Sequence, residues 1–242
     1  MWWCKSINSN IDMTIDLNAK RKKYLIITFI FQLAVAISSL VIGDLVKDGK
    51  LNIPLKLYVV VHLLILLAVH YFAFATTCLY FKKKRSKVLY GLLIFGGFLL
   101  NFIAESPSIR GQPAAGFIFS LATAILLLAM VIWFVVIVKD IFIEAHDLTY
   151  RILGAANIYW LLVVMFAYLY AIFEYSFPGS FGVVLTSKAD LINYSFKLSL
   201  HSMVGIDHHF DHLELALENF TLIQATISNL FIVFLVGRLL TK

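Results

Sequence analysis

The chain has 242 residues, of which 61% are hydrophobic and only 14% are charged, and its mean hydropathy is +0.89. This composition excludes a soluble domain, whose surface would need far more charge. Lys and Arg exceed Asp and Glu by six, and the two cysteines are too few for a disulfide framework or a four-cysteine zinc site. Six spans of about 20 residues would occupy about half of the chain, so its length fits a compact membrane protein.

Six apolar runs follow one another along the chain. They cover residues 24–42, 57–81, 88–103, 114–138, 152–173 and 220–240. A backbone in lipid must satisfy its own hydrogen bonds, and continuous hydropathy does not fit alternating barrel strands, so the runs should be helices. The predicted fold class is an all-α integral membrane protein with six transmembrane helices.

Two basic runs set the predicted orientation. Residues 20–23 precede the first apolar run, and five bases lie within residues 82–87, between the second and third runs. The positive-inside rule places both runs in the cytoplasm, and therefore both termini as well. We interpret them as anchors to the lipid bilayer rather than as nucleic-acid contacts. The predicted location is the inner cell membrane, with multiple passes.

The segment between the fifth and sixth runs, residues 174–219, is too long for a turn. Lys188 and Asp190 can begin a helix, and apolar and polar side chains then alternate as far as Leu200. About 12 residues suit a re-entrant helix, and we expect residues 202–207 to follow as an extended, ion-lining strand. This order of elements is the layout of a channel pore loop.

Because of this order of elements, the segment from residue 152 to residue 242 resembles the two-helix pore domain of the prokaryotic potassium-channel superfamily. The selectivity filter of that family reads T-x-G-Y-G-D. A gap-free match of residues 199–207 to T-L-T-T-V-G-Y-G-D keeps Leu200 and Asp207. One deletion instead aligns Val204, Gly205 and Ile206 with V-G-Y. The sequence does not decide between these two alignments.

The resemblance implies a homotetramer around a shared pore, with potassium or sodium as the permeant ion and no other cofactor. It places His201 at the end of the pore helix and Ser228 where the last helix usually has a hinge glycine. Because only one filter glycine is kept, we expect poor or altered selectivity, or no conduction. The implied selectivity filter consists of Ser202, Met203, Val204, Gly205, Ile206 and Asp207.

The predicted domains are a cytoplasmic N-terminal segment (1–23), a four-helix membrane bundle (24–147) and the pore domain (148–242). The bundle resembles a channel sensor only in its number of helices. Residues 114–138 contain no Lys or Arg, which excludes voltage gating by that helix. Gly91, Gly96 and Gly97 should allow close helix packing.

Histidines suggest two further features. His208, His209 and His212, beside Asp207, could bind a metal ion or sense protons, or could be solvated loop residues. His62 and His70, two turns apart in the second run, are interpreted as buried polar contacts to Tyr or to backbone.

The sequence therefore favours a cation channel that is not voltage-gated. The alternative is a non-conducting membrane effector on a channel-derived fold. A transporter or membrane enzyme is least favoured, because no span carries paired acids or a nucleophile motif. We expect no enzymatic activity.

Overall fold

The computed structural model describes residues 2–42, 45, 54–104, 106, 113–141, 147–183, 185, 188–205 and 213–240. The part of the chain so described is all-α. Its helices are α1 (Trp2–Ile37), which continues as a π-helical turn (Ser38–Ile42), α3 (Leu55–Tyr80), α4 (Lys84–Ala104), α5 (Pro113–Ile141), α6 (Leu148–Ser176), α7 (Lys188–Val204) and α8 (Leu215–Leu240).

Four helices are long and apolar enough to cross a membrane, which fits an all-α membrane protein. These stretches are Lys84–Ala104, Ala114–Ile141, Leu148–Ser176 and Leu215–Phe234. A shorter apolar helix covers Leu64–Tyr80. The six predicted apolar runs are helical except for Phe81, the last residue of the second run, but the number of six spans stays a prediction.

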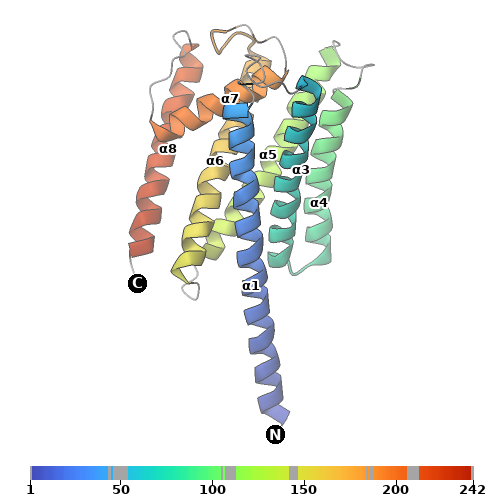
Figure 1. Ribbon diagram of the computed structural model, residues 1–242, viewed down its shortest axis with the longest axis vertical. Helices are drawn as coiled ribbons and strands as arrows, with labels where there is room; N and C mark the ends of the chain where they lie inside the picture. The colour runs from blue at the N-terminus through green and yellow to red at the C-terminus, as the bar shows by residue number, and fades with distance from the viewer. Residues whose placement is uncertain are drawn as a thin grey trace.

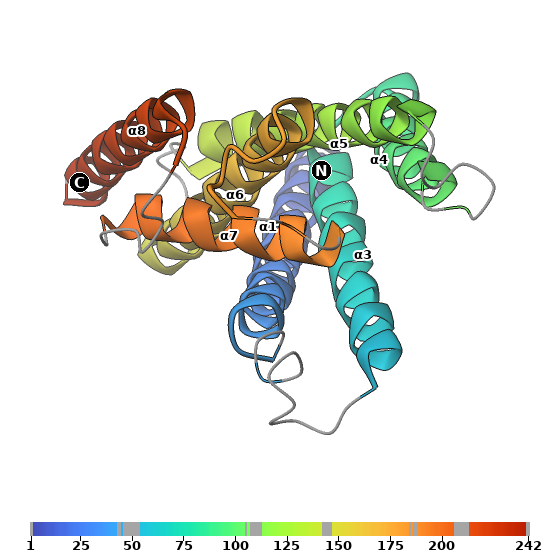
Figure 2. The ribbon, with the colours of Figure 1, turned by 90° about the horizontal axis from the view of Figure 1, so that it is seen from above.

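The long helices run side by side, and α7 starts at one end of them and slants toward the middle of α8 (Figures 1 and 2). That end also holds the turn after α6, residues 177–183, and we call it the loop end. At the opposite end, Lys82 and Lys83 connect α3 to α4. We call it the basic end. Helix α8 ends there, and α1 begins beyond it (Figure 1).

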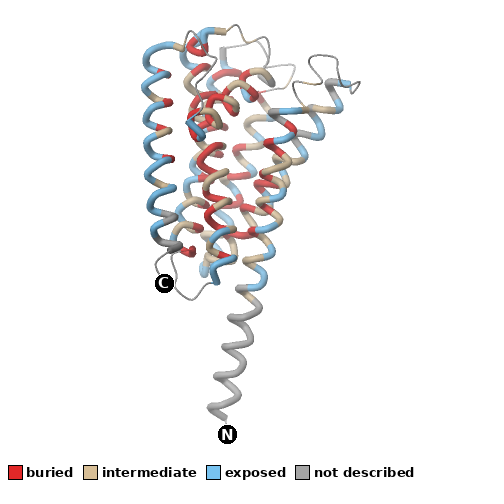
Figure 3. The backbone as a smooth tube through the Cα atoms, turned by 60° about the vertical axis from the view of Figure 1, so that its left-hand side comes forward, coloured by how far each residue is buried: buried red, intermediate tan, exposed pale blue. Residues whose placement is uncertain are grey.

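The core lies mainly between α5 and α6. Its largest fully buried side chains there include Trp133, Ile137, Ile158 and Leu161. Figure 3 shows this buried interior, while the outer faces of the helices are exposed. Phe102, for example, is 77% exposed. Large apolar side chains on the outside are what a lipid-facing surface requires.

Small residues allow α4 to approach α5. A Cβ atom on Gly97 would lie 2.7 Å from the Leu126 side chain, and one on Gly91 would lie 3.2 Å from Phe74 of α3. The predicted close packing is therefore confirmed for these two glycines. The same prediction is wrong for Gly96, because a Cβ atom added there would meet nothing within 4 Å.

Candidate functional site

The short helix α7 packs against α6 and α8. Its buried side chains include Leu191, Phe196 and Leu198, and the ring of Phe196 stacks on Trp160 of α6. Asp190 lies in the first turn, where its charge complements the positive end of the helix dipole. The start at Lys188 is where the sequence predicts it.

Two contacts show how far α7 reaches along its neighbours. The Ser199 hydroxyl donates to the Val163 carbonyl of α6 at 2.7 Å, and the Ser228 hydroxyl of α8 lies 3.0 Å from Met203 Sδ. Val163 is about 20 Å from the loop end of α6, and Ser228 is about 20 Å from the start of α8, at 1.5 Å per residue. The last turns of α7 therefore reach the middle of α6 and α8.

A buried polar network holds α7 at that depth. The Tyr170 hydroxyl of α6 donates to Gln224 Oε1 of α8 at 2.6 Å. Gln224 Nε2 in turn donates to the Ser199 carbonyl and to its hydroxyl oxygen, both at 2.9 Å. All three side chains are fully buried. We call Tyr170, Ser199 and Gln224 the mid-bundle cluster.

The prediction that the first part of the filter is an extended strand is wrong. Ser202, Met203 and Val204 are not extended, because they form the last turn of α7. Nothing in this stretch breaks a helix before Gly205, which has φ +73° and donates its N–H to the His201 carbonyl at 2.9 Å. A glycine in this left-handed conformation is a common helix terminator.

The other predicted site residues divide into two groups. His201 lies in the last turn of α7 and Ser228 is buried in α8, where its hydroxyl also donates to the Gln224 carbonyl at 2.8 Å. Ile206, Asp207, His208, His209 and His212 lie outside the described residues. Their roles in a filter or a metal site stay predictions.

Two carboxylates organise the loop end above α7. Glu174 Oε1 accepts the Gly179 N–H at 2.7 Å and Oε2 accepts the Phe181 N–H at 2.9 Å. Ser180 donates its hydroxyl to Glu214 Oε2 at 2.7 Å, and its carbonyl accepts the Glu214 N–H at 3.0 Å. The end of α6 is thus tied to the start of α8.

The face of α8 that points away from α6 and α7 is partly polar. Leu217, Gln224 and Ser228 form the buried face of this helix. Asn219, Thr226 and Asn229 are exposed and lie on the opposite side at 3.6 residues per turn. The Thr226 hydroxyl donates to the Leu222 carbonyl of its own helix at 2.9 Å. The Asn219 and Asn229 amides, in a membrane span, need a protein neighbour or water.

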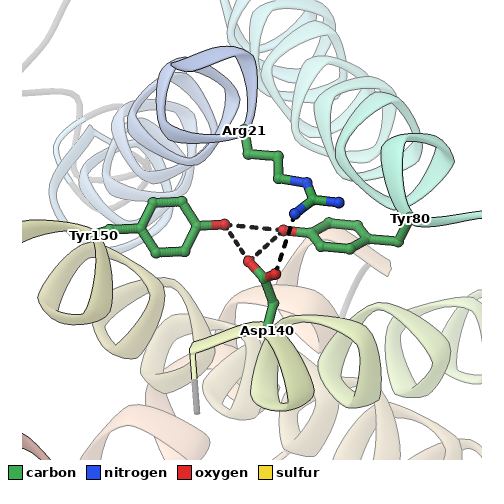
Figure 4. A network of polar contacts seen from close by, with 4 residues as sticks. All are labelled: Arg21, Tyr80, Asp140 and Tyr150. Carbon is green, nitrogen blue, oxygen red and sulfur yellow. Dashed lines mark hydrogen bonds and ion pairs between the residues drawn. The ribbon is translucent and has the colours of Figure 1, made fainter. Parts of the chain in front are cut away.

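A second polar cluster lies at the basic end (Figure 4). Asp140 of α5 accepts hydrogen bonds from the hydroxyls of Tyr80 in α3, at 2.6 Å, and Tyr150 in α6. Arg21 of α1 lies 3.5 Å from the same carboxylate, and its guanidinium lies 4.2 Å from the centroid of the Tyr80 ring. We call these four residues the basic-end cluster. It joins four helices.

Sequence reasoning missed the residues that make these contacts. Gln224 and Glu174 are polar residues inside or at the end of apolar runs, and that position is a signal that could have identified them. Asp140 follows the fourth apolar run, but its partner Arg21 is 119 residues away along the chain. No local pattern indicates that pair.

No protein-family profile, curated protein or solved structure matches this chain. The fold and the apolar outer surface define the class as an all-α membrane protein.

Proposed function

We propose that the chain is one subunit of a homotetrameric membrane channel that conducts monovalent cations, potassium or sodium, without voltage gating. In this proposal α6, α7 and α8 form the pore unit, and six helices cross the membrane. The basic end faces the cytoplasm, as the positive-inside rule favours.

The observation that carries the proposal is the depth of α7. This helix starts at the loop end, and its last turn contacts Ser228 in the middle of α8. Glu214, only nine residues after Gly205, is bonded to Ser180 back at the loop end. A chain that enters to mid-depth and returns supports a re-entrant pore loop.

The helix dipole at the end of α7 suits a cation, whereas a positive charge on His201, in the last turn, would oppose one. The C-terminal end of a helix carries a partial negative charge, and its last carbonyl groups lack partners inside the helix. Four such ends meeting at an axis would stabilise a cation there. Since Ser202–Val204 are helical, the ion would meet the end of this helix rather than an extended strand.

The polar face of α8 supports self-association. Asn219, Thr226 and Asn229 are exposed in a single chain. Around a central axis, the same face of four copies would line a water-filled path, where these side chains would be hydrated. Figure 3 shows how little of α8 one chain buries.

The non-conducting effector stays a second candidate because of one observation. The potassium-channel filter is extended, whereas Ser202, Met203 and Val204 are helical. A chain that keeps the pore fold but not this conformation could assemble without passing ions.

Ion flux through purified protein in liposomes tests the proposal. We expect potassium or sodium flux that Gly205→Val abolishes, because a β-branched residue resists the positive φ at this position. Within one chain, a Cβ on Gly205 would meet nothing within 4 Å, so the substitution introduces no clash inside the subunit.

Gly179→Val is the matched control. Gly179 also has positive φ, at +94°, and open space around its Cβ, but it lies in the turn after α6. Flux should survive in this variant. Tetramers that carry no flux in the wild type would favour the effector, and a monomer in the membrane would contradict both proposals.

A further inference from the structure

Two basic runs that are far apart in the sequence meet at the end of α3. Arg21, inside the run 20–23 of α1, lies 4.2 Å from the centroid of the Tyr80 ring (Figure 4). The run 82–87 follows Tyr80 almost at once and connects α3 to α4. The two runs contain nine Lys and Arg residues and no acid. The basic end of the bundle is therefore strongly positive.

The acids near these runs are paired with bases of α1. Asp140 pairs with Arg21, and Asp147 pairs with Lys22. The bases of the run 82–87 have no acidic partner among the described residues, and the first turn of α4 contains no acid. A partner that covers this patch must therefore supply negative charge. The exposed bases of the patch are Lys82, Lys83, Lys84 and Arg85.

This basic patch lies where the headgroups of a bilayer would be. Directly after it, α4 exposes Val88, Leu89 and Leu92, which are 53%, 62% and 64% exposed. Because such apolar side chains suit a lipid-facing surface, the bases before them lie at the boundary between hydrocarbon and headgroups. Each base near a membrane surface strengthens the binding of an anionic lipid about five-fold.

The seam between α3 and α4 leads from the patch into the membrane. Lys87 of α4 lies within electrostatic range of Cys78 of α3. One turn further in, Gly91 of α4 approaches Phe74 of α3, because a Cβ atom on Gly91 would lie 3.2 Å from the Phe74 ring. Phe74 also lines an apolar cavity of about 310 Å³ between the two helices. The patch and the cavity therefore lie along the same pair of helices.

The cavity borders the surface where lipid would lie. Tyr71 and Phe95 of its wall are 60% and 65% exposed. Ile94, also in the wall, is seven residues beyond Lys87, or about 10 Å along α4. The tails of one leaflet fill about 15 Å, half of a hydrocarbon core, so a tail whose headgroup is at the patch reaches the cavity.

His70 lies in the same wall but is bonded to its own helix. Its Nδ1 lies 2.8 Å from the Leu66 carbonyl, so the predicted contact of a buried His70 to backbone is confirmed. The rest of the wall is apolar and aromatic, which suits a hydrocarbon chain.

We propose that this face of α3 and α4 binds an anionic phospholipid from the leaflet at the basic end. Its phosphate lies against the bases of the run 82–87, and one acyl chain lies in the cavity. A zwitterionic lipid has the chain but no net negative charge for the bases. A soluble anion has the charge but no chain. The site does not depend on ion conduction.

Native mass spectrometry of the full chain in detergent micelles tests the proposal. The probes are phosphatidylglycerol and phosphatidylcholine with the same 18-carbon chains, and phosphatidylglycerol with six-carbon chains. Half-occupancy should need about five-fold less of the anionic than of the zwitterionic long-chain lipid, the effect of one base. The six-carbon lipid should bind about three-fold more weakly than its long-chain counterpart, because its chains are too short to fill the cavity.

Two double variants locate the headgroup. Lys83→Gln with Lys84→Gln should raise the concentration of long-chain phosphatidylglycerol for half-occupancy about ten-fold or more. Lys20→Gln with Lys23→Gln, on α1 at the same end, should change it less than about two-fold, because these bases lie outside the seam. All four side chains are exposed, so both double variants remove the same charge without removing packing.

Two single variants locate the acyl chain. Phe95→Ala should remove most of the advantage of the long-chain over the six-carbon phosphatidylglycerol, because it deletes an aromatic wall of the cavity. Phe102→Ala is the matched control, since it deletes an equally large, 77% exposed ring from the same helix outside the wall. That variant should keep the advantage.

Equal occupancy by the anionic and the zwitterionic lipid would overturn the proposal. Equal losses in the two lysine double variants would also overturn it, because a diffuse positive surface rather than a site would then hold the lipid. Competition by glycerol phosphate at the concentration of the lipid would identify a site for soluble anions instead. If chain length has no effect, or if Phe95→Ala and Phe102→Ala weaken binding equally, the cavity does not hold the chain.

Discussion

The mid-bundle cluster and the basic-end cluster both join helices through buried polar side chains, but they differ in charge. Tyr170, Ser199 and Gln224 are all neutral and fully buried. The basic-end cluster contains an ionisable pair, Arg21 and Asp140, and the Arg21 side chain is 16% exposed.

The difference follows from the cost of removing a charge from water. That cost is largest at mid-depth and smaller near a membrane surface, where a long side chain can reach water. Amide and hydroxyl groups therefore join the last turns of α7 to the middle of α6 and α8, while a carboxylate with several partners joins α1 to the end of the bundle. Breaking each cluster should show which one contributes more to stability.

Asp140→Ala should have the largest effect. It leaves Arg21 unpaired and removes the common acceptor of Tyr80 and Tyr150, so the free energy of unfolding should fall by about 3 kcal/mol. Reversible unfolding in mixed detergent and SDS micelles measures the change.

Lys22→Met is the matched control at the same end. Lys22 also pairs with an acid, Asp147, at 2.9 Å, but the two side chains are 36% and 59% exposed. Such a pair should contribute less than about 1 kcal/mol. Equal losses for Asp140→Ala and Lys22→Met would show that the basic-end cluster is no stronger than a surface ion pair.

The two clusters also differ in how far sequence could predict them. The pattern from Lys188 onward predicts α7, and its neighbours α6 and α8 coincide with apolar runs. Sequence thus places Ser199 and Gln224 on adjacent elements, although it does not reveal their contact. Arg21, Tyr80 and Asp140 are separated by about 60 residues at each step, and only the packed bundle brings them together.

The error at the end of α7 has a local cause. A family resemblance predicts an extended strand from Ser202, but a helix already begun continues until a residue stops it. Ser202, Met203 and Val204 do not stop it, and Gly205 does. The position of this glycine was a better guide to the helix end than the likeness to a filter.

Gln224→Leu should cause the next largest loss in the free energy of unfolding. Leu has a similar size but makes none of the three hydrogen bonds that Gln224 makes to Tyr170 and Ser199. At about 0.6 kcal/mol for each bond between membrane helices, the loss should be about 2 kcal/mol by the same unfolding measurement.

Thr123→Val provides the control. Thr123 is also buried in a membrane span, but its hydroxyl donates to Phe119 of its own helix, at 2.8 Å. Its loss should change the stability by less than about 0.5 kcal/mol, since no contact between helices is removed. If both variants lose the same amount, Gln224 does not hold α7 in place.

The smallest change in stability is expected for two serines that lie one turn apart on α7. The Ser199 hydroxyl donates to the Val163 carbonyl and accepts from Gln224. Ser195 is only 1% exposed, and its hydroxyl has no hydrogen-bond partner among the described residues. Ser199→Ala should therefore cost about 1 kcal/mol, and Ser195→Ala should be neutral or slightly stabilising, because it removes an unsatisfied buried hydroxyl. Since both changes delete the same atom from the same helix, helix propensity cancels between them. Equal effects would mean that burial alone, rather than the mid-bundle hydrogen bonds, sets the depth of α7.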